Sequence, residues 1–186
     1  KICIDSFCAS SAWSFLFADQ SGKGRLRASE QNCYIRYAVK DEGELVFYRE
    51  VFADKEILAK IQFMQDNANN LKPIYTGYDL IIAADLLEEL ICPILFLKNI
   101  HERLNKNGLL LLTSTYEWND NFTKREHWPG GFKQDGEPVS SFEGIKSILM
   151  ENFILEKQPE NIVHSHWNSS RTSEHKISEL SIWRKK

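Results

Sequence analysis

The residues best suited to chemistry follow a short apolar run near the middle of the chain. Glu126 and His127 lie there, in a segment of residues 113–132, and both are groups that can orient or deprotonate a ligand. The same segment carries five aromatic rings among its charges: Tyr116, Trp118, Phe122, Trp128 and Phe132. An aromatic face stacks on planar ligands and attracts a cation by about 0.5–2 kcal/mol. The segment therefore predicts a small-molecule pocket, with Pro129-Gly130-Gly131 able to bend as its cover. The alternative is a surface loop whose rings fill a satellite core.

The sequence around this segment predicts a rigid support for it. Tyr78–Ala84 is an apolar run of strand length, and Pro93 can open a helix that is expected to run to about Leu104. Residues 105–108 then turn the chain into a second strand at Leu109–Thr113. Strand, helix and strand at this spacing form a βαβ unit, so the two strands should be parallel.

Polar residues follow the predicted strands at their carboxyl ends, where open α/β sheets bind ligands. Asp85 comes directly after the strand at Tyr78–Ala84, and Glu88 lies three residues later. This is the spacing of a capping box, so the two acids are expected to start a helix rather than to perform acid–base chemistry. Another predicted strand, Lys1–Asp5, ends at Asp5 and is followed by the turn of residues 6–11.

The remaining elements complete an α/β pattern. In the first part of the chain we expect a short helix, a hairpin of two strands and one further strand: Ser11–Ala18, Tyr34–Ala38 with Glu44–Val51, and Ile61–Gln65. In the last part we expect a helix capped by Ser140 and two strands joined by a polar loop: residues 141–150, Phe153–Lys157 and Ile177–Trp183. A parallel α/β core whose last two strands form an antiparallel edge is the predicted architecture.

Composition excludes several classes of protein. The 186 residues fit one domain, 1–186, with a sizeable core, and 42% hydrophobic content is typical of a globular chain. A net charge of −3 argues against nucleic acid or an anionic membrane as a partner, and no apolar run is long enough for a transmembrane helix. The four cysteines have no disulfide or CxxC pattern, which favours a reducing cytosol. Because the chain opens with K-I-C-I-D, a strand without a preceding Met, we expect a C-terminal fragment of a longer protein.

Three histidines near the C-terminus are candidate metal ligands. His164 and His166 would lie on the same side of a strand, with His175 beyond them. No carboxylate or cysteine accompanies them at a ligand-like spacing, so we predict solvated loop histidines and no metal site.

Four stretches of the sequence together resemble one family. They are D-E-G-E-L-V-x-Y-R-E-V (residues 41–51), N-L-K-P-x-x-T-G-Y-D-L (70–80), I-H-E-R-L-N-x-x-G-L-L (100–110) and W-x-G-G-F-K-x-D-G-E (128–137). The combination is similar to the C-terminal domain of OvoA-type ovothiol synthases, a 4-mercaptohistidine N1-methyltransferase. The resemblance implies a class I (Rossmann-like) fold that uses S-adenosyl-L-methionine to methylate the imidazole ring of 5-thiohistidine (4-mercaptohistidine). It also implies an upstream sulfoxide synthase module in the same parent chain.

The resemblance also implies site residues. The cofactor would contact the turn after the first strand, the loop near residue 67 and the end of the central strand, through Asp5, Cys8, Ala9, Asp66, Asn67, Ala68, Ala84 and Asp85. On the acceptor side, Tyr116, Trp118 and Trp128 would stack on the ring, and Glu126 or His127 would orient or deprotonate it. Arg171 would pair with the substrate carboxylate. The alternatives are core packing for the two tryptophans and a surface salt bridge for Arg171.

The cofactor turn departs from the family pattern. Phe7 and Ser11 stand where the family has glycines, which permit backbone angles and close ligand approach that a side chain forbids. Asp19 and Glu30 are the candidates for the acid that binds the ribose. A second hypothesis is therefore a methyltransferase fold without catalysis that serves as a structural or interaction domain. A third, a nucleotide-binding oxidoreductase, is disfavoured because no G-x-G-x-x-G occurs.

Overall fold

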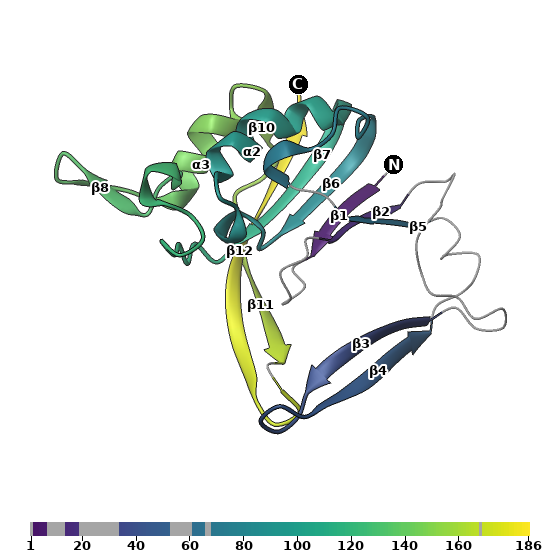
Figure 1. The fold of residues 1–186 in the computed structure, drawn as a ribbon. Coiled ribbons are helices and arrows are strands. Elements are labelled where there is room, and N and C mark those ends of the chain that lie inside the picture. The colour runs from purple at the N-terminus through teal and green to yellow at the C-terminus, as the bar shows by residue number, and fades with distance from the viewer. Residues whose placement is uncertain (1, 7–13, 19–33, 53–60, 66–67, 168) are drawn as a thin grey trace.

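The computed structural model describes residues 2–6, 14–18, 34–52, 61–65, 68–167 and 169–186 (Figure 1). Several residues singled out above lie outside these ranges: Phe7, Cys8, Ala9, Ser11, Asp19, Glu30, Asp66 and Asn67. No helix in the part of the chain that the structure describes is long and apolar enough to cross a membrane.

The described chain is built mainly of strands. The strands are β1 Ile2–Ser6, β2 Ser14–Ala18, β3 Tyr34–Lys40, β4 Val46–Phe52, β5 Ile61–Gln65, β6 Tyr78–Ala84, β7 Leu104–Ser114, β8 Phe132–Gln134, β9 Glu137–Val139, β10 Phe153–Leu155, β11 Glu160–Trp167 and β12 Ser173–Lys185. The α-helices are α2 Pro93–Asn99 and α3 Ser141–Leu149, and the 3₁₀ helices are η1 Ala68–Asn70, η2 Leu87–Glu89, η3 Ile100–Arg103 and η4 Arg125–His127.

The main sheet has the order β10-β12-β7-β6-β1-β2-β5, with β11 paired to β12. Read from the β5 end and numbered in chain order, the strands of this path run 3-2-1-4-5-7-6. The first five positions match the strand order, though not all the strand directions, of the doubly wound order 3-2-1-4-5-6. The direction of winding reverses between β1 and β6, and this is the point of an open α/β sheet where ligands bind. The α/β class and the antiparallel C-terminal edge are therefore confirmed.

The sheet is less parallel than the sequence suggested. Only the three central strands are parallel, through the pairs β1–β6 and β6–β7, while β12 and β10 on one side and β2 and β5 on the other pair antiparallel. The predicted helix at Ser11–Ala18 is wrong over its last five residues, because Ser14–Ala18 forms β2 between β1 and β5. The sequence S-F-L-F-A is rich in aromatic residues, and pairing on both sides suits it better than a helix.

The predicted βαβ unit is present with shifted boundaries. β6 has the expected bounds, and α2 opens at Pro93 but ends at Asn99, after which η3 continues to Arg103. β7 already begins at Leu104, and its register against β6 shifts so that residues 105–108 are absorbed within the strand instead of forming a separate turn. The Asn105 amide holds this irregularity by donating to Gly77 O at 3.1 Å and to Asp79 Oδ1 at 2.8 Å.

The core lies between the sheet and the helices α2 and α3, which cover one of its faces (Figure 1). The apolar side chains that fill it are almost fully buried: Ile81, Ala83, Phe96, Leu97, Leu110, Leu112, Ile145, Leu149 and Trp183. α3 is capped as predicted, because the Ser140 hydroxyl accepts from the Glu143 N–H at 3.2 Å. Burial of this layer fixes the carboxyl ends of β6 and β7 relative to each other.

The prediction of a polar loop before the last strand is wrong over residues 160–167. Residues 160–167 form β11, which pairs with β12 over its whole length. Its residues show no apolar face that would have revealed a strand, so pairing with β12 defines it. β11 and the adjoining half of β12 make a two-stranded arm that extends away from the sheet (Figure 1).

The tip of this arm contacts the hairpin of β3 and β4. The Ser170 N–H donates to Lys40 O at 2.9 Å, and the Ser170 hydroxyl bonds to Asp41. Arg171 pairs with Glu42 in the same contact. The predicted hairpin is thus confirmed, and its turn is joined to a segment far away in the sequence.

Candidate active site

The carboxyl ends of β6 and β7 are joined by Asp85 and Thr113. The Asp85 N–H lies 3.1 Å from Thr113 O and 3.0 Å from Thr113 Oγ1, and the Thr113 hydroxyl donates to Asp85 Oδ1 at 2.9 Å. Asp85 has φ of 48°, a left-handed conformation that is costly for a side-chain-bearing residue and that is found at functional sites more often than elsewhere. Tertiary contacts therefore hold this aspartate in an unusual conformation at the switch point of the sheet.

The expected capping box is wrong. The helix after Asp85 is the short η2, its N-cap is Leu86, and no side chain caps it. The carboxylates of Asp85 and Glu88 are both used across the sheet edge instead, because partners on β7 are within reach.

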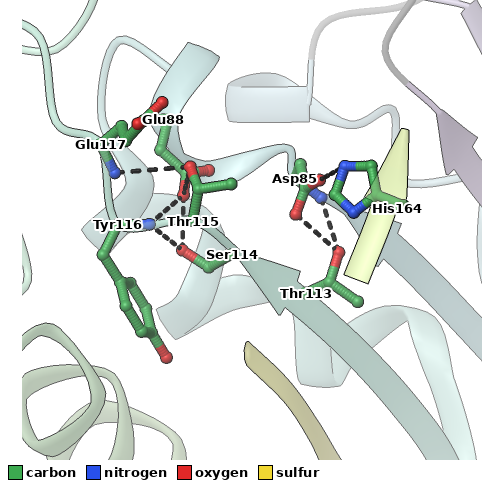
Figure 2. A network of polar contacts seen from close by, with 8 residues as sticks. All are labelled: Asp85, Glu88, Thr113, Ser114, Thr115, Tyr116, Glu117 and His164. Atoms are coloured by element: carbon green, nitrogen blue, oxygen red, sulfur yellow. Dashed lines mark hydrogen bonds and ion pairs between the residues drawn. The ribbon is translucent and has the colours of Figure 1, made fainter. Parts of the chain in front are cut away.

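Glu88 is the buried acid of the site, with 7% of its surface exposed. Its Oε1 accepts from Ser114 Oγ at 2.6 Å, from the Tyr116 N–H at 2.8 Å and from Thr115 Oγ1 at 3.3 Å (Figure 2). Its Oε2 is buried and has no partner in the described part of the chain. A buried carboxylate oxygen without a donor is costly, so Glu88 is held here at the expense of one unsatisfied polar atom.

Tyr116 is bound at both ends. Its N–H donates to Glu88, and its hydroxyl donates to Glu179 Oε1 on β12 at 2.7 Å. Burial raises the pKa of Tyr116 far above its usual value, and the carboxylates of Glu179 and Glu88 add to the effect. The phenol is therefore a permanent donor and not a base. Its φ of 59° is a second left-handed conformation at the same edge.

His164 approaches this edge from β11. Its Nε2 lies 3.3 Å from Asp85 Oδ2, and 37% of the His164 side chain and 27% of the Asp85 side chain are exposed (Figure 2). The prediction of a solvated loop histidine is wrong for His164, which is a strand residue facing a carboxylate. The alternation of His164, Ser165 and His166 is the sequence signal that could have indicated a strand here. It gives no indication that Asp85 is the partner of His164. No group of three or more potential ligands in the described ranges could hold a metal ion.

Asp5 and Ala84 share the carboxyl edge with Asp85. Asp5 pairs in register with Ala83, and Ser6 pairs with Ala84. Ala68, also expected near the cofactor, is 4% exposed in η1. It lines a cavity of about 70 Å³ between η1 and α2.

The two tryptophans of the ring-rich segment pack on each other. Their ring centroids are 6.3 Å apart with an interplanar angle of 26°. The Trp118 indole donates to Ser141 Oγ at 2.8 Å, and the Trp128 indole donates to Thr123 O at 2.8 Å. This arrangement agrees with the core-packing alternative, and stacking on a ligand ring stays a prediction.

The Pro129-Gly130-Gly131 sequence is tightly packed, contrary to its expected role as a bending cover. A Cβ on Gly130 would lie 2.3 Å from Ser140 O, and one on Gly131 would lie 2.9 Å from Trp118 Cδ1. Facing them, a Cβ on Gly144 of α3 would lie 1.6 Å from Pro129 O. The glycines thus allow close contact between the segment and α3.

The other predicted acceptor residues lie elsewhere. Glu126 and His127 belong to η4 and are paired with each other at 3.6 Å, with the Glu126 side chain 70% exposed. Arg171 is at the tip of the arm, paired with Glu42, as the surface salt-bridge alternative expected. The structure therefore brings Asp85, Tyr116 and Ala84 to one edge and does not bring Arg171 there. Sequence reasoning missed Glu88, Glu179 and His164 as parts of the site.

Comparison with known proteins gives distant similarities of structure. No family model and no curated protein matches the chain. One solved structure, from work on the conversion of a disulfide bond into a thioacetal group during echinomycin biosynthesis, has a TM-score of 0.46 and 10% identity, covering 64% of this chain and 54% of that one. The N-methyltransferase NodS from Bradyrhizobium japonicum WM9, in complex with S-adenosyl-L-homocysteine, has a TM-score of 0.39 and 16% identity over 64% and 52% of the two chains.

A SAM-dependent methyltransferase from Methanosarcina mazei has a TM-score of 0.42 and 12% identity over 64% of this chain and 65% of that chain. The chain thus spans between about half and two thirds of the length of these solved structures. Similarities this distant assign no family, so the function has to be inferred from the site itself.

Proposed function

We propose that the chain is a methyltransferase domain that uses S-adenosyl-L-methionine. The observation that carries the proposal is the switch point between β1 and β6, where the carboxyl edge of the parallel strands bears Asp85, Glu88 and Tyr116. Ligands of doubly wound sheets bind at this place. The sequence resemblance to the methyltransferase domain of ovothiol synthases supports the same function, and it supports 5-thiohistidine as the acceptor.

The residues at this edge fit a cationic cofactor. Asp85, bonded to Thr113, supplies one carboxylate at this edge. Glu88 and Glu179, joined through Tyr116, supply two more. Opposite charges attract strongly where water is excluded. When bound, S-adenosyl-L-methionine supplies an electrophilic methyl group on a positively charged sulfur. The Tyr116 phenol, held by Glu179 and with its pKa raised by burial, would stay neutral.

The acceptor side needs alignment and exclusion of water. Residues 115–123 cover η2, because the buried Thr123 hydroxyl donates to Leu90 O at 2.5 Å. This bond anchors the segment that follows Tyr116, while Glu88 and Glu179 hold Tyr116 itself. Alignment of this kind is the main contribution that a protein makes to a group transfer.

The test is a calorimetric titration with S-adenosyl-L-homocysteine, followed by a methylation assay on 5-thiohistidine. We expect micromolar binding that is weakened by Asp85→Asn and unchanged by Asp79→Asn, since Asp79 lies at the opposite end of β6. Absence of heat and of thermal stabilisation at millimolar ligand would overturn the proposal.

A structural or interaction role is the second candidate. Apolar side chains are exposed on the arm and on the hairpin it contacts: Leu45, Val46, Tyr48, Val163 and Ile177. Val163 and Ile177 are partners across β11 and β12, so they form one exposed pair. Failure of cofactor binding in the titration above would favour this role.

A further inference from the structure

We propose that His164 is the general base of the methyl transfer and that Asp85 orients it. The inference rests on the proposed function and deepens it, because it names the group that receives the proton of the acceptor. It also specifies the acceptor class, a nitrogen heteroaromatic that carries an exchangeable N–H.

The geometry has three connected groups. Asp85 Oδ2 lies 3.3 Å from His164 Nε2, and Asp85 Oδ1 accepts from the Thr113 hydroxyl at 2.9 Å. The Thr113 oxygens in turn accept from the Asp85 N–H, and rotation of the carboxylate would break its bond from the Thr113 hydroxyl. A base oriented by a carboxylate that is itself fixed is the arrangement on which histidine general bases rely.

The location suits a base. Asp85 directly follows Ala84, which pairs with Ser6 of β1, so the dyad lies at the switch point. The His164 side chain is 37% exposed, and its Nδ1 has no partner among the described residues. With Nε2 facing Asp85, the free Nδ1 is the atom available to a ligand. The left-handed φ of Asp85 is strain at the same place.

The charged groups around His164 come from three elements. Asp85 faces it from the end of β6, and Lys176 is its partner on β12. Glu89 of η2 interacts electrostatically with Lys176, and its pKa is raised by burial and by Glu88. Lys176 is therefore partly offset by Glu89, and the carboxylate of Asp85 is the group in direct contact with the ring.

One proton leaves the acceptor ring when the methyl group is transferred to it. The acceptor-ring nitrogen with a free lone pair forms the new bond to the methyl carbon, and the carbon–sulfur bond breaks with its electron pair staying on sulfur. The proton on the other ring nitrogen moves to His164 Nδ1. The imidazolium produced lies against the Asp85 carboxylate, which stabilises it.

The first experiment compares His164→Gln with His175→Gln in the methylation of 5-thiohistidine. His175 is an exposed histidine of the same arm and bonds only to Ser165 among the described residues. We expect His164→Gln to lower kcat by about 10²–10⁴-fold, with unchanged affinity for S-adenosyl-L-homocysteine and partial rescue by added imidazole in His164→Ala. The matched His175→Gln should behave as wild type. Full kcat in His164→Gln would overturn the inference.

A second measurement does not depend on turnover. Diethyl pyrocarbonate acylates accessible neutral imidazoles, and mass spectrometry of peptides reports the modification at each histidine. We expect His164 to react in the free protein and to be protected by S-adenosyl-L-homocysteine with L-histidine, while His175 reacts in both states. Equal reaction of His164 in both states, when calorimetry shows binding, would overturn the inference and leave the proposed function standing. No binding of S-adenosyl-L-homocysteine would overturn both.

Discussion

The hydroxyl of Tyr116 donates to the carboxylate of Glu179 at 2.7 Å and thereby joins the segment after β7 to β12. The same tyrosine is held through its N–H by Glu88. These two bonds hold Tyr116, whose backbone is left-handed, at the carboxyl edge of the sheet. The orientation of its ring therefore depends on both Glu88 and Glu179.

Removal of either partner should therefore cost stability. We expect Tyr116→Phe and Glu179→Ala each to lower the free energy of unfolding by about 1–2 kcal/mol, because a partly buried polar group loses its partner. In a double-mutant cycle by urea denaturation, the two losses should be less than additive, since both remove the same bond. Strict additivity would show that the bond contributes nothing in solution.

Glu88 gives a sharper contrast between two substitutions. Glu88→Ala should destabilise by about 2–4 kcal/mol, because the buried Ser114 hydroxyl and the Tyr116 N–H lose their acceptor and a cavity is left. Glu88→Gln keeps an accepting oxygen and removes a buried charge, so it should cost much less. Equal losses in thermal and urea denaturation would contradict this assignment of the oxygens.

Glu89 predicts a dependence of stability on pH. Burial, aided by the charge of Glu88, raises the pKa of Glu89 above that of an exposed glutamate, so the charged form is disfavoured in the folded state and destabilises it at neutral pH. This penalty disappears as pH falls through the raised pKa and below the unfolded value. Glu89→Gln should therefore be more stable than wild type at pH 7 and equal to it at about pH 4 and below. A variant that is less stable at pH 7 would contradict the sign.

Gly144 tests the close packing of α3 against the ring-rich segment. Gly144→Ala places a methyl group 1.6 Å from Pro129 O, a backbone atom that cannot move alone. We expect a loss of about 3 kcal/mol or more. The matched control is Gly136→Ala, where no atom lies within 4 Å and only the φ of 89° is strained, so about 1 kcal/mol is expected. Similar losses in the two variants would mean that the segment moves easily.

Local signals in the sequence predicted the centre of the fold. The apolar run of β6, the proline that opens α2 and the serine cap of α3 each act over a few residues, so the sequence shows them directly. β2 and β11 were missed because their stability comes from strands on either side or from a long partner, and not from a pattern of their own.

The site was predictable in position and less so in its contacts. The rule that ligands bind at the carboxyl ends of strands selected Asp85 and Tyr116. The partners of these residues, Glu179 and His164, come from β12 and β11, far along the chain. The spacing of Asp85 and Glu88 predicted a helix cap. In the folded chain Glu88 instead accepts hydrogen bonds from Ser114 at the end of β7 and from the Tyr116 N–H. Such competition between local and distant partners is decided only in the folded molecule.

The arm is held by contacts at two places along its length. Within β11, His164 contacts Asp85, and beyond the far end of β11 the Ser170 N–H donates to Lys40 O of the β3–β4 hairpin. The strands of residues 34–52 pair with each other and not with the main sheet, and their hairpin contacts the tip of the arm that carries His164. Without that hairpin, the tip of the arm would lose the hydrogen bond from Ser170 to Lys40 and the ion pair between Arg171 and Glu42.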